Sequence, residues 1–143
     1  MAIVRPAELT DTEAISSLLI ELGYPASPAL VLQKLHLLSG SDHDAVYVAE
    51  ISDAVAGVIS VHTTELFHCN GRLGRITALV VSATYRGAGV GKSLLAVADA
   101  FFLQQRCIRA EVTSGDHRPR THEFYQANGY AADERRFVKP YPI

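Results

Sequence analysis

A glycine-rich segment from Arg86 to Ser93 has residue types and a spacing suited to binding phosphate. Glycines at alternate positions let the backbone approach a ligand without a Cβ clash. The unpaired N–H groups at the start of a helix then point at the anion. A helix start is expected here, because a β-branched run from Ile76 to Val81 precedes the segment and apolar residues at helical spacing follow it. The segment therefore predicts a phosphate site between a strand and a helix.

Two common phosphate-binding patterns do not fit this segment. A Walker A loop needs glycine where Arg86 stands, although the Gly-Lys-Ser that ends such a loop is present. A dinucleotide-binding fingerprint that begins at Gly87 needs its third glycine where Lys92 stands. The pattern that remains is Arg86-x-x-Gly89-x-Gly91. It resembles the acyl-CoA pyrophosphate loop of the GNAT acetyltransferase superfamily.

A second segment supports the same resemblance. Phe124-Tyr125, followed by Gly129-Tyr130, is similar to the Phe-Tyr-x-x-x-Gly-Phe/Tyr segment of that family. The resemblance implies that acetyl-CoA is the cosubstrate, with its pantetheine arm on the strand before the loop and its pyrophosphate on the loop amides. The residues implied to bind it are Leu79, Val80, Val81, Arg86, Gly87, Ala88, Gly89, Val90, Gly91, Lys92, Ser93 and Tyr125.

Tyr125 is the candidate catalytic acid. An amine that attacks a thioester expels a thiolate, and a phenol within hydrogen-bond reach can protonate or stabilise the departing sulfur. The unperturbed pKa of a phenol is about 10 and that of a thiol about 8.5, so full proton transfer is uphill and hydrogen bonding alone can serve. The alternative role of Tyr125 is that of an amphipathic core residue beside Phe124.

The general base departs from the pattern of the family. Many GNAT members carry a glutamate two residues before the leucine that Leu79 matches, and this chain has Thr77 there. A threonine cannot accept a proton at neutral pH. An amine with an unperturbed pKa near 10.4 is almost entirely protonated at pH 7, so another group must take its proton.

Glu111 is the first candidate for that base. It lies on a predicted strand from Ile108 to Thr113, on the face opposite the apolar residues. The alternative is that Glu111 forms an ion pair with Arg109 or another neighbour. His62 and His117 are further candidates.

The predicted elements follow the GNAT order. Strands are expected at residues 2–6, 45–51, 54–66, 75–82, 108–113 and 133–138, and helices from a capping box at Thr10–Glu13 to Leu22, at 28–38, at 89–105 and from Pro119 to Asn128. The expected fold is therefore an α+β, three-layer, GNAT-like domain. Its mixed, mostly antiparallel central sheet has a parallel pair at strands 4 and 5 and is flanked by helices. Residues 1–143 are expected to form this single domain.

Composition excludes several other classes. The 143 residues are 48% hydrophobic and 20% charged, and a net charge of −2 argues against nucleic-acid binding by bulk electrostatics. Charged residues interrupt the first 20 residues, and no apolar run approaches the roughly 18 residues that span a membrane. We therefore expect a cytoplasmic protein without a membrane partner. Cys69 and Cys107 are expected to be free thiols. No metal site is expected, because His122-Glu123 lacks the second histidine of a zincin motif.

The residues and the resemblance together predict an acetyl-CoA-dependent N-acetyltransferase. It would transfer acetyl to a primary amine of a small molecule by direct attack in a ternary complex. One alternative is a non-catalytic acyl-CoA-binding module, which needs neither acid nor base, and another is a protein or peptide N-acetyltransferase. The apolar segment from Phe137 to Ile143 is compatible with a homodimer and with packing on the domain's own sheet.

Overall fold

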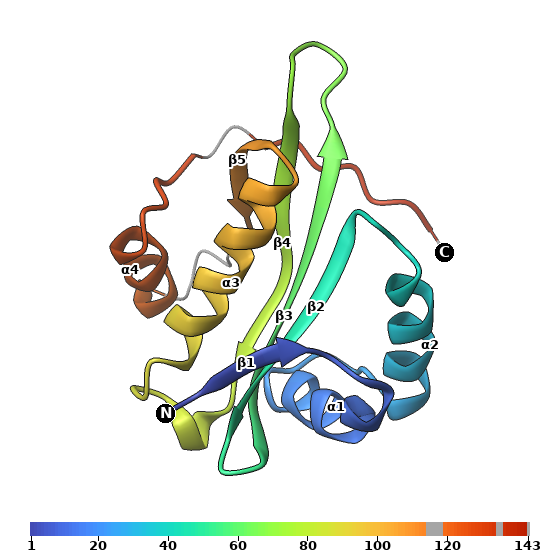
Figure 1. The fold of residues 1–143 in the computed structure, drawn as a ribbon, viewed down its shortest axis with the longest axis vertical. Helices are drawn as coiled ribbons and strands as arrows, with labels where there is room; N and C mark the ends of the chain where they lie inside the picture. Colours follow the sequence, from blue (N-terminus) through green and yellow to red (C-terminus); the bar gives the residue numbers. More distant parts are fainter. Residues whose placement is uncertain (114–118, 134–135, 143) are drawn as a thin grey trace. The chain divides into compact units, whose positions relative to one another are not determined.

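A computed structural model describes residues 1–113, 119–133 and 136–142. The chain divides into two compact units, Met1–Thr113 and Ser114–Ile143, and each is described by itself. The strands are β1 (Ile3–Pro6), β2 (Asp44–Ile51), β3 (Ala54–Glu65), β4 (Arg72–Val81) and β5 (Cys107–Val112) (Figure 1). The α-helices are α1 (Thr12–Glu21), α2 (Pro28–Ser39), α3 (Val90–Gln104) and α4 (Pro119–Ala127), and the short 3-10 helices are η1 (Leu9–Asp11) and η2 (Ala83–Tyr85).

The sheet of the first unit has the predicted mixed topology. Its strand order is β1-β2-β3-β4-β5, with three antiparallel pairs followed by the parallel pair β4–β5. A parallel pair needs a crossover, and α3 supplies it. The turn between β2 and β3 is the expected one, because Ser52 and Asp53 have φ angles of 49° and 67° and form a two-residue hairpin connection. The expectation of a GNAT-like mixed sheet is confirmed.

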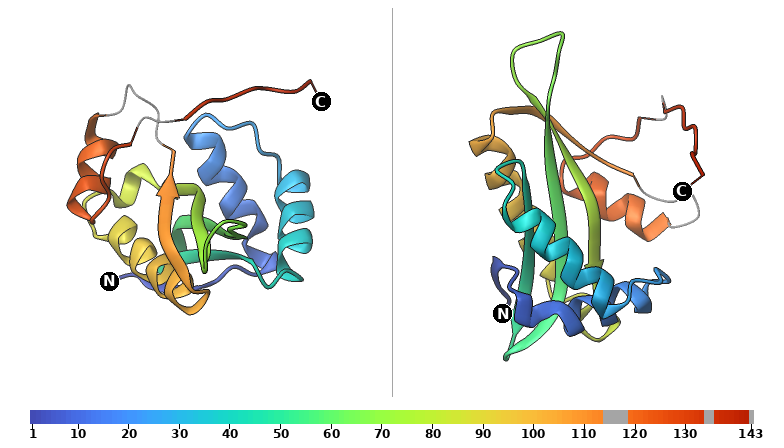
Figure 2. Two further views of the ribbon diagram at one scale, coloured as in Figure 1. Left: turned by 90° about the horizontal axis from the view of Figure 1, so that it is seen from above. Right: turned by 90° about the vertical axis from the view of Figure 1, so that its right-hand side faces the viewer.

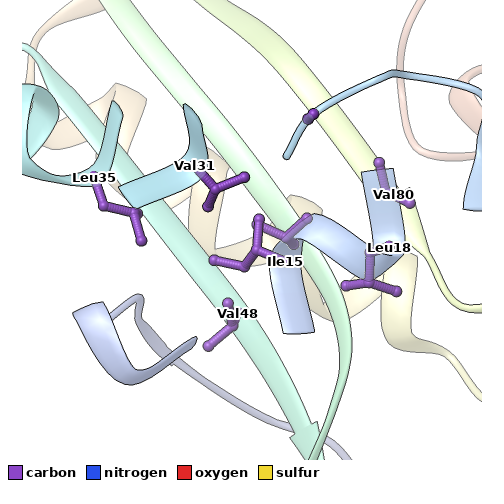
Figure 3. Packing of buried hydrophobic residues seen from close by; sticks show 8 residues of the cluster. Ile15, Leu18, Val31, Leu35, Val48 and Val80 are labelled. Carbon is purple, nitrogen blue, oxygen red and sulfur yellow. The ribbon is translucent and has the colours of Figure 1, made fainter. Parts of the chain in front are cut away.

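Helices α1 and α2 cover one face of this sheet, and α3 covers the other (Figure 2). On the α1–α2 face, a core of aliphatic side chains joins the helices to β2, β3 and β4 (Figure 3). Its buried members are Ile15, Leu18, Ala26, Val31, Leu35, Val48, Val58 and Val80. The helical spacing of the α1 and α2 members accounts for their common face.

Helix α3 approaches the other face very closely. A Cβ on Gly74 would lie 2.5 Å from the ring of Phe102, and a Cβ on Gly57 would lie 3.0 Å from a methyl of Val90. Glycine at these two strand positions therefore lets α3 pack directly on β3 and β4. This face is filled by the helix over that stretch of the sheet.

The first helix begins with a different cap from the predicted one. The carboxylate of Asp11 accepts the N–H of Glu8 at 2.7 Å and closes the 3-10 turn Leu9–Asp11. Helix α1 then starts without a side-chain cap. The capping box expected at Thr10–Glu13 is wrong, because Thr10 lies inside the 3-10 turn and does not stand at the start of α1.

Asp11 is also the centre of a partly buried ion-pair group. Its two oxygens accept from Arg5 Nη1 and Nη2 at 2.8 and 2.9 Å, and Arg5 Nε donates to Glu50 at 2.6 Å. Hydrogen bonds from the Arg5 guanidinium hold the pKa of Asp11 below its ordinary value near 3.8, although burial opposes this. The two carboxylates in turn raise the pKa of Arg5. The group ties β1 to β2 and to the start of α1.

The substitution Asp11→Asn is expected to lower the free energy of unfolding by about 2 kcal/mol at neutral pH, because an amide cannot accept both charge-assisted bonds. A carboxyl group with a lowered folded pKa adds stability above its unfolded pKa and loses it as the pH falls through the folded value. The difference between wild type and variant should therefore be complete above about pH 4 and shrink below it. Urea unfolding across the acid range measures this, and a pH-independent difference would contradict the ion-pair explanation.

The two cysteines are free thiols, as expected. Cys69 is exposed, whereas Cys107 is half-buried at the start of β5. Burial raises the pKa of the Cys107 thiol, and the nearby Arg72 opposes that effect. Within the described residues, no helix has the length and apolar character needed to cross a bilayer.

The second unit contains α4 and an aromatic group at its end. The ring centroids of Phe124 and Tyr125 lie 5.3 Å apart, and those of Tyr125 and Tyr130 lie 5.6 Å apart. Gly129 has a φ of 94°, and the N–H of Tyr130 bonds back to the carbonyl of Tyr125, so the helix ends where Asn-Gly predicts.

The predicted last strand, at residues 133–138, is wrong for the part that the structure describes. Asp133 and residues 136–138 belong to no strand, and residues 134 and 135 lie outside the described residues. A strand needs a partner whose backbone completes its hydrogen-bond ladder, and no described strand pairs with these residues. Prolines follow at positions 140 and 142 and cannot donate to one.

Candidate active site

The glycine-rich loop lies where β4 leads through η2 into α3. Gly87 and Gly89 have φ angles of 82° and 78°, in the left-handed region that glycine adopts without strain. A Cβ on either residue would meet no atom within 4 Å. The backbone conformation, and not crowding, therefore requires glycine at both positions.

The N–H groups of this loop fall into two sets. Those of Arg86 and Ala88 donate within the segment, to the carbonyls of Ala83 at 3.5 Å and Tyr85 at 3.2 Å. The others find no acceptor among the described residues, and they belong to Gly87, Gly89, Val90, Gly91 and Lys92. Of the amides expected to bind pyrophosphate, these five are available for it. Such consecutive free donors at a helix start suit an anion.

The loop is anchored at its end and positively charged at its rim. Val90 is 1% exposed, and Ser93 donates both its N–H and its hydroxyl to the carbonyl of Gly89, each at 3.0 Å. Arg86 and Lys92 are exposed, and neither pairs with an acidic side chain in the described part of the chain. A rigid turn with free amides and two unpaired cations fits a pyrophosphate group.

The last residues of β4 have no described strand partner on one side, and this side is called the free edge. Its pairing with β5 ends at Ile76 and Val112, whereas β4 continues to Val81. Over Ala78–Val81 it pairs with β3, and no described strand pairs with its other side. A free edge offers N–H and C=O groups to an extended ligand. The predicted pantetheine-binding residues lie here, with the side chain of Val80 in the core and those of its two neighbours half-buried.

Thr77 is the extra residue of a β-bulge at the start of this edge. Ser60 pairs with Ala78 and Val61 with Ile76, so Thr77 has no partner of its own on β3. Its hydroxyl donates to the Ser60 side chain at 2.9 Å, on the face of the sheet that α1 and α2 partly cover. Bulges of this kind occur often beside active sites, where they redirect a side chain.

Glu111 forms the ion pair that was the alternative to catalysis. Its Oε1 accepts from Arg75 Nη1 at 3.4 Å, and its Oε2 accepts from Arg109 Nε at 3.1 Å. Arg75 also donates from Nη2 to the hydroxyl of Thr113 at 2.8 Å. The carboxylate lies on the same face of the sheet as Thr77, with both of its oxygens bound to arginine.

His62 has a partner that the sequence did not reveal. Its Nδ1 lies 2.7 Å from Oδ1 of Asp44, which stands opposite it on β2. The other carboxylate oxygen of Asp44 accepts from the hydroxyl of Ser41, also at 2.7 Å. The side chains of His62 and Asp44 are 42% and 18% exposed. An imidazole held by a carboxylate in this way has its second nitrogen free for proton transfer.

Two further site candidates do not belong to the first unit. Tyr125 belongs to the second unit, where it is half-buried between Phe124 and Tyr130. His117 lies outside the described residues. Among the described residues, no cluster of three or more histidine, cysteine or acidic side chains could hold a metal ion.

Comparisons with known proteins agree with this geometry. Residues 42–132 match the family model of the acetyltransferase (GNAT) domain. The chain is 28% identical over 137 residues to the aminoalkylphosphonate N-acetyltransferase of Salmonella typhimurium. The aligned residues cover 95% of this chain and 89% of that protein.

Solved structures share the fold. A transcriptional regulator from Bacillus halodurans has a TM-score of 0.88 at 18% identity, covering 99% of this chain and 100% of its own. An aminoglycoside N-acetyltransferase in complex with CoA has a TM-score of 0.86 at 17% identity, covering 100% of this chain and 96% of its own. At such identities the likeness is one of fold.

Proposed function

The chain belongs to the GNAT family of acetyltransferases and is an enzyme, and we propose that it transfers acetyl from acetyl-CoA to a primary amine of a small molecule. The observation that carries this proposal is the set of free N–H groups at Gly87 and Gly89–Lys92, which lies next to the free edge of β4. A pyrophosphate and an extended amide chain, joined in one ligand, match these two features in that order. We further propose that residues 1–143 act as a single domain.

The free edge also indicates where the acyl group lies. With the pyrophosphate on the loop, the pantetheine arm runs along Leu79–Val81 towards the point where β5 joins β4. The five residue-to-residue steps from Val81 back to Ile76 span about 17 Å of extended chain. The pairing of Ile76 with Val112 closes the gap there, so the thioester end belongs beside Thr77.

The acceptor amine must reach this point from one face of the sheet. Helix α3 fills the other face, with Phe102 against Gly74 and Val90 against Gly57. The face shared by Thr77 and His62 is open enough to leave Thr77 exposed. We therefore place the acceptor site on this face, in the part that α1 and α2 do not cover.

The reaction is direct attack of the amine on the thioester carbonyl. We propose Tyr125 as the group that protonates or stabilises the departing sulfur, as the resemblance implies. The base is proposed to be a side chain on the acceptor face, where Glu111 and His62 both lie. Bound acetyl-CoA supplies the activated acyl group, and the protein positions the amine and removes its proton.

The acceptor is proposed to be a small amine that also carries an anionic group. The curated relative is named for an aminoalkylphosphonate. On the acceptor face, Arg75 and Arg109 present guanidinium groups of the kind that bind phosphonate or phosphate, at present paired with Glu111. The free thiols are consistent with action in the reducing cytoplasm.

An amine panel tests this function. Thiol release above the hydrolysis background should be fastest with a 2-aminoalkylphosphonate, slower with an uncharged amino sugar and absent with a peptide N-terminus. Preference for the peptide would favour the protein or peptide N-acetyltransferase. Tight acetyl-CoA binding without thiol release from any amine would contradict the proposed transfer.

We also propose a homodimer formed through the C-terminal segment. Phe137 is 99% exposed and Tyr141 72% exposed within the chain, and apolar side chains exposed to that extent favour a partner. Light scattering should give twice the mass of one chain, and Phe137→Glu should give the monomer mass. A monomeric wild type would exclude this assembly.

A further inference from the structure

We propose that His62 is the general base of the acetyl transfer and that Asp44 is its positioning residue. This inference rests on the proposed function and adds to it the group that takes the proton from the amine. It starts from the 2.7 Å contact between His62 Nδ1 and Asp44 Oδ1. A carboxylate accepts only, so the contact assigns the ring proton to Nδ1 and leaves the Nε2 lone pair free.

The carboxylate is itself held in place. Asp44 accepts at its second oxygen from the hydroxyl of Ser41, and its side chain is mostly buried, at 18% exposure. Its backbone belongs to β2, directly opposite His62 in the ladder. The imidazole is therefore oriented by a residue on a rigid strand, which is the arrangement that keeps a base in one tautomer and one direction.

His62 lies on the acceptor face, close to the reacting end of the donor site. It is two residues from Ser60 on β3, so both side chains share one face at a spacing of about 7 Å. The Ser60 hydroxyl accepts from Thr77, which marks the closed end of the free edge. One amine nitrogen, or one amine and one water, bridges a gap of this size.

The other charged groups around this position have different partners. Arg75 stands opposite His62 on β4, and its guanidinium donates to Glu111 and Thr113 on β5. Glu111 is bound at both oxygens by arginine. Among the described side chains on this face, His62 is thus the titratable group with a free acceptor atom and a fixed orientation.

In the proposed step the ammonium group loses two protons. The ammonium group gives one proton to His62 Nε2, the nitrogen–carbonyl carbon bond forms, and the carbon–sulfur bond breaks. The second proton shed by the nitrogen leaves with the thiolate as the CoA thiol. His62 then returns its proton to solvent, so no oxidant, reductant or metal is consumed.

The test uses the full-length protein and two kinds of readout. In NMR spectra of 15N-labelled histidine, the His62 ring should carry its proton at Nδ1 in wild type and lose that preference in Asp44→Asn. In steady-state kinetics with the best amine of the panel, His62→Gln should lower kcat about 100-fold and KM less than about threefold, as expected for a lost base. Asp44→Asn should lower kcat about tenfold.

Chemical rescue and a matched variant separate catalysis from structure. Added imidazole should restore activity to His62→Ala, because a mobile base replaces the missing ring. His43→Gln, an exposed histidine next to Asp44, should retain wild-type rates. Calorimetry should show unchanged acetyl-CoA affinity in His62→Gln.

Each contrary result has a distinct meaning. The role of His62 would be overturned if the wild type turns over and His62→Gln is as fast, or if Glu111→Gln loses more activity than His62→Gln. The proposed function would stand in either case. An Nε2–H ring in wild type would overturn the role of Asp44. Absence of wild-type turnover with every amine would overturn the proposed function and this inference together.

Discussion

Gly89→Glu is expected to weaken acetyl-CoA binding at least about 100-fold, equivalent to about 2.7 kcal/mol. The position is open, so a glutamate side chain fits without a clash, and its carboxylate comes to lie at the start of α3. There it competes with the pyrophosphate for the free N–H groups and repels it. Two like charges about 4 Å apart near a protein surface interact by about 4 kcal/mol, enough to account for the loss.

Gly89→Ala is the matched control for this prediction. Alanine and glutamate both pay roughly 1 kcal/mol to adopt the φ of 78° observed at this residue. They differ in the charge that they add. Calorimetry with acetyl-CoA should therefore show a loss of less than about tenfold for Gly89→Ala, and thermal melts should show similar stability for both variants. Equal affinities of the two variants would argue against an anion site at this loop.

Tyr125→Phe is expected to lower kcat by at least about tenfold while acetyl-CoA affinity stays within about threefold of wild type. Phenylalanine keeps the ring that packs against Phe124 and Tyr130, at centroid distances of 5.3 and 5.6 Å. The hydroxyl that would hydrogen-bond the departing sulfur is lost. The measurement is the rate of CoA thiol release at saturating acetyl-CoA and amine.

Tyr130→Phe provides the comparison, because it removes a hydroxyl from the same aromatic group of the second unit. Its kcat should remain within about threefold of wild type, whatever the change in thermal stability. A Tyr125→Phe rate as high as that of Tyr130→Phe would leave Tyr125 with a structural role.

Most of the fold could be predicted because its signals are local. Ser27 caps α2 through the N–H of Leu30, and Pro28 occupies the first turn, where the predicted helix begins. Gly89 immediately precedes α3, and Gly129 follows the turn that ends α4. Each of these features depends on the dihedral preference or the hydrogen bonds of a few consecutive residues. For the same reason, the glycine-rich loop between β4 and α3 could be predicted from the sequence.

The two predictions of local structure that were wrong depended on contacts with other parts of the chain. The expected capping box at Thr10–Glu13 is absent because Arg5 on β1 and the N–H of Glu8 hold Asp11, so that Thr10 lies inside a 3-10 turn and not at the start of α1. The expected strand at residues 133–138 has no ladder partner among the described residues. In both cases a contact with another part of the chain, or its absence, decided the outcome.

By itself, the sequence determined the conformation of the glycine-rich loop, since the positive φ angles at Gly87 and Gly89 are ones that glycine adopts without strain. The tertiary structure decided the partner of His62. With the two-residue turn at Ser52-Asp53, an unbroken ladder would place Asp44 opposite Val61. Ala56 is an extra residue on β3, and the shift in register that it causes places Asp44 opposite His62 instead.

A shift of one residue moves every following side chain relative to its neighbour strand, so this bulge sets which groups share the acceptor face. It lies next to Gly57, which Val90 and Leu94 of α3 approach closely. Helix α3 comes more than thirty residues further along the chain. The physical reason is that the partner of His62 depends on the register between two strands, and no local pattern within one strand records that register.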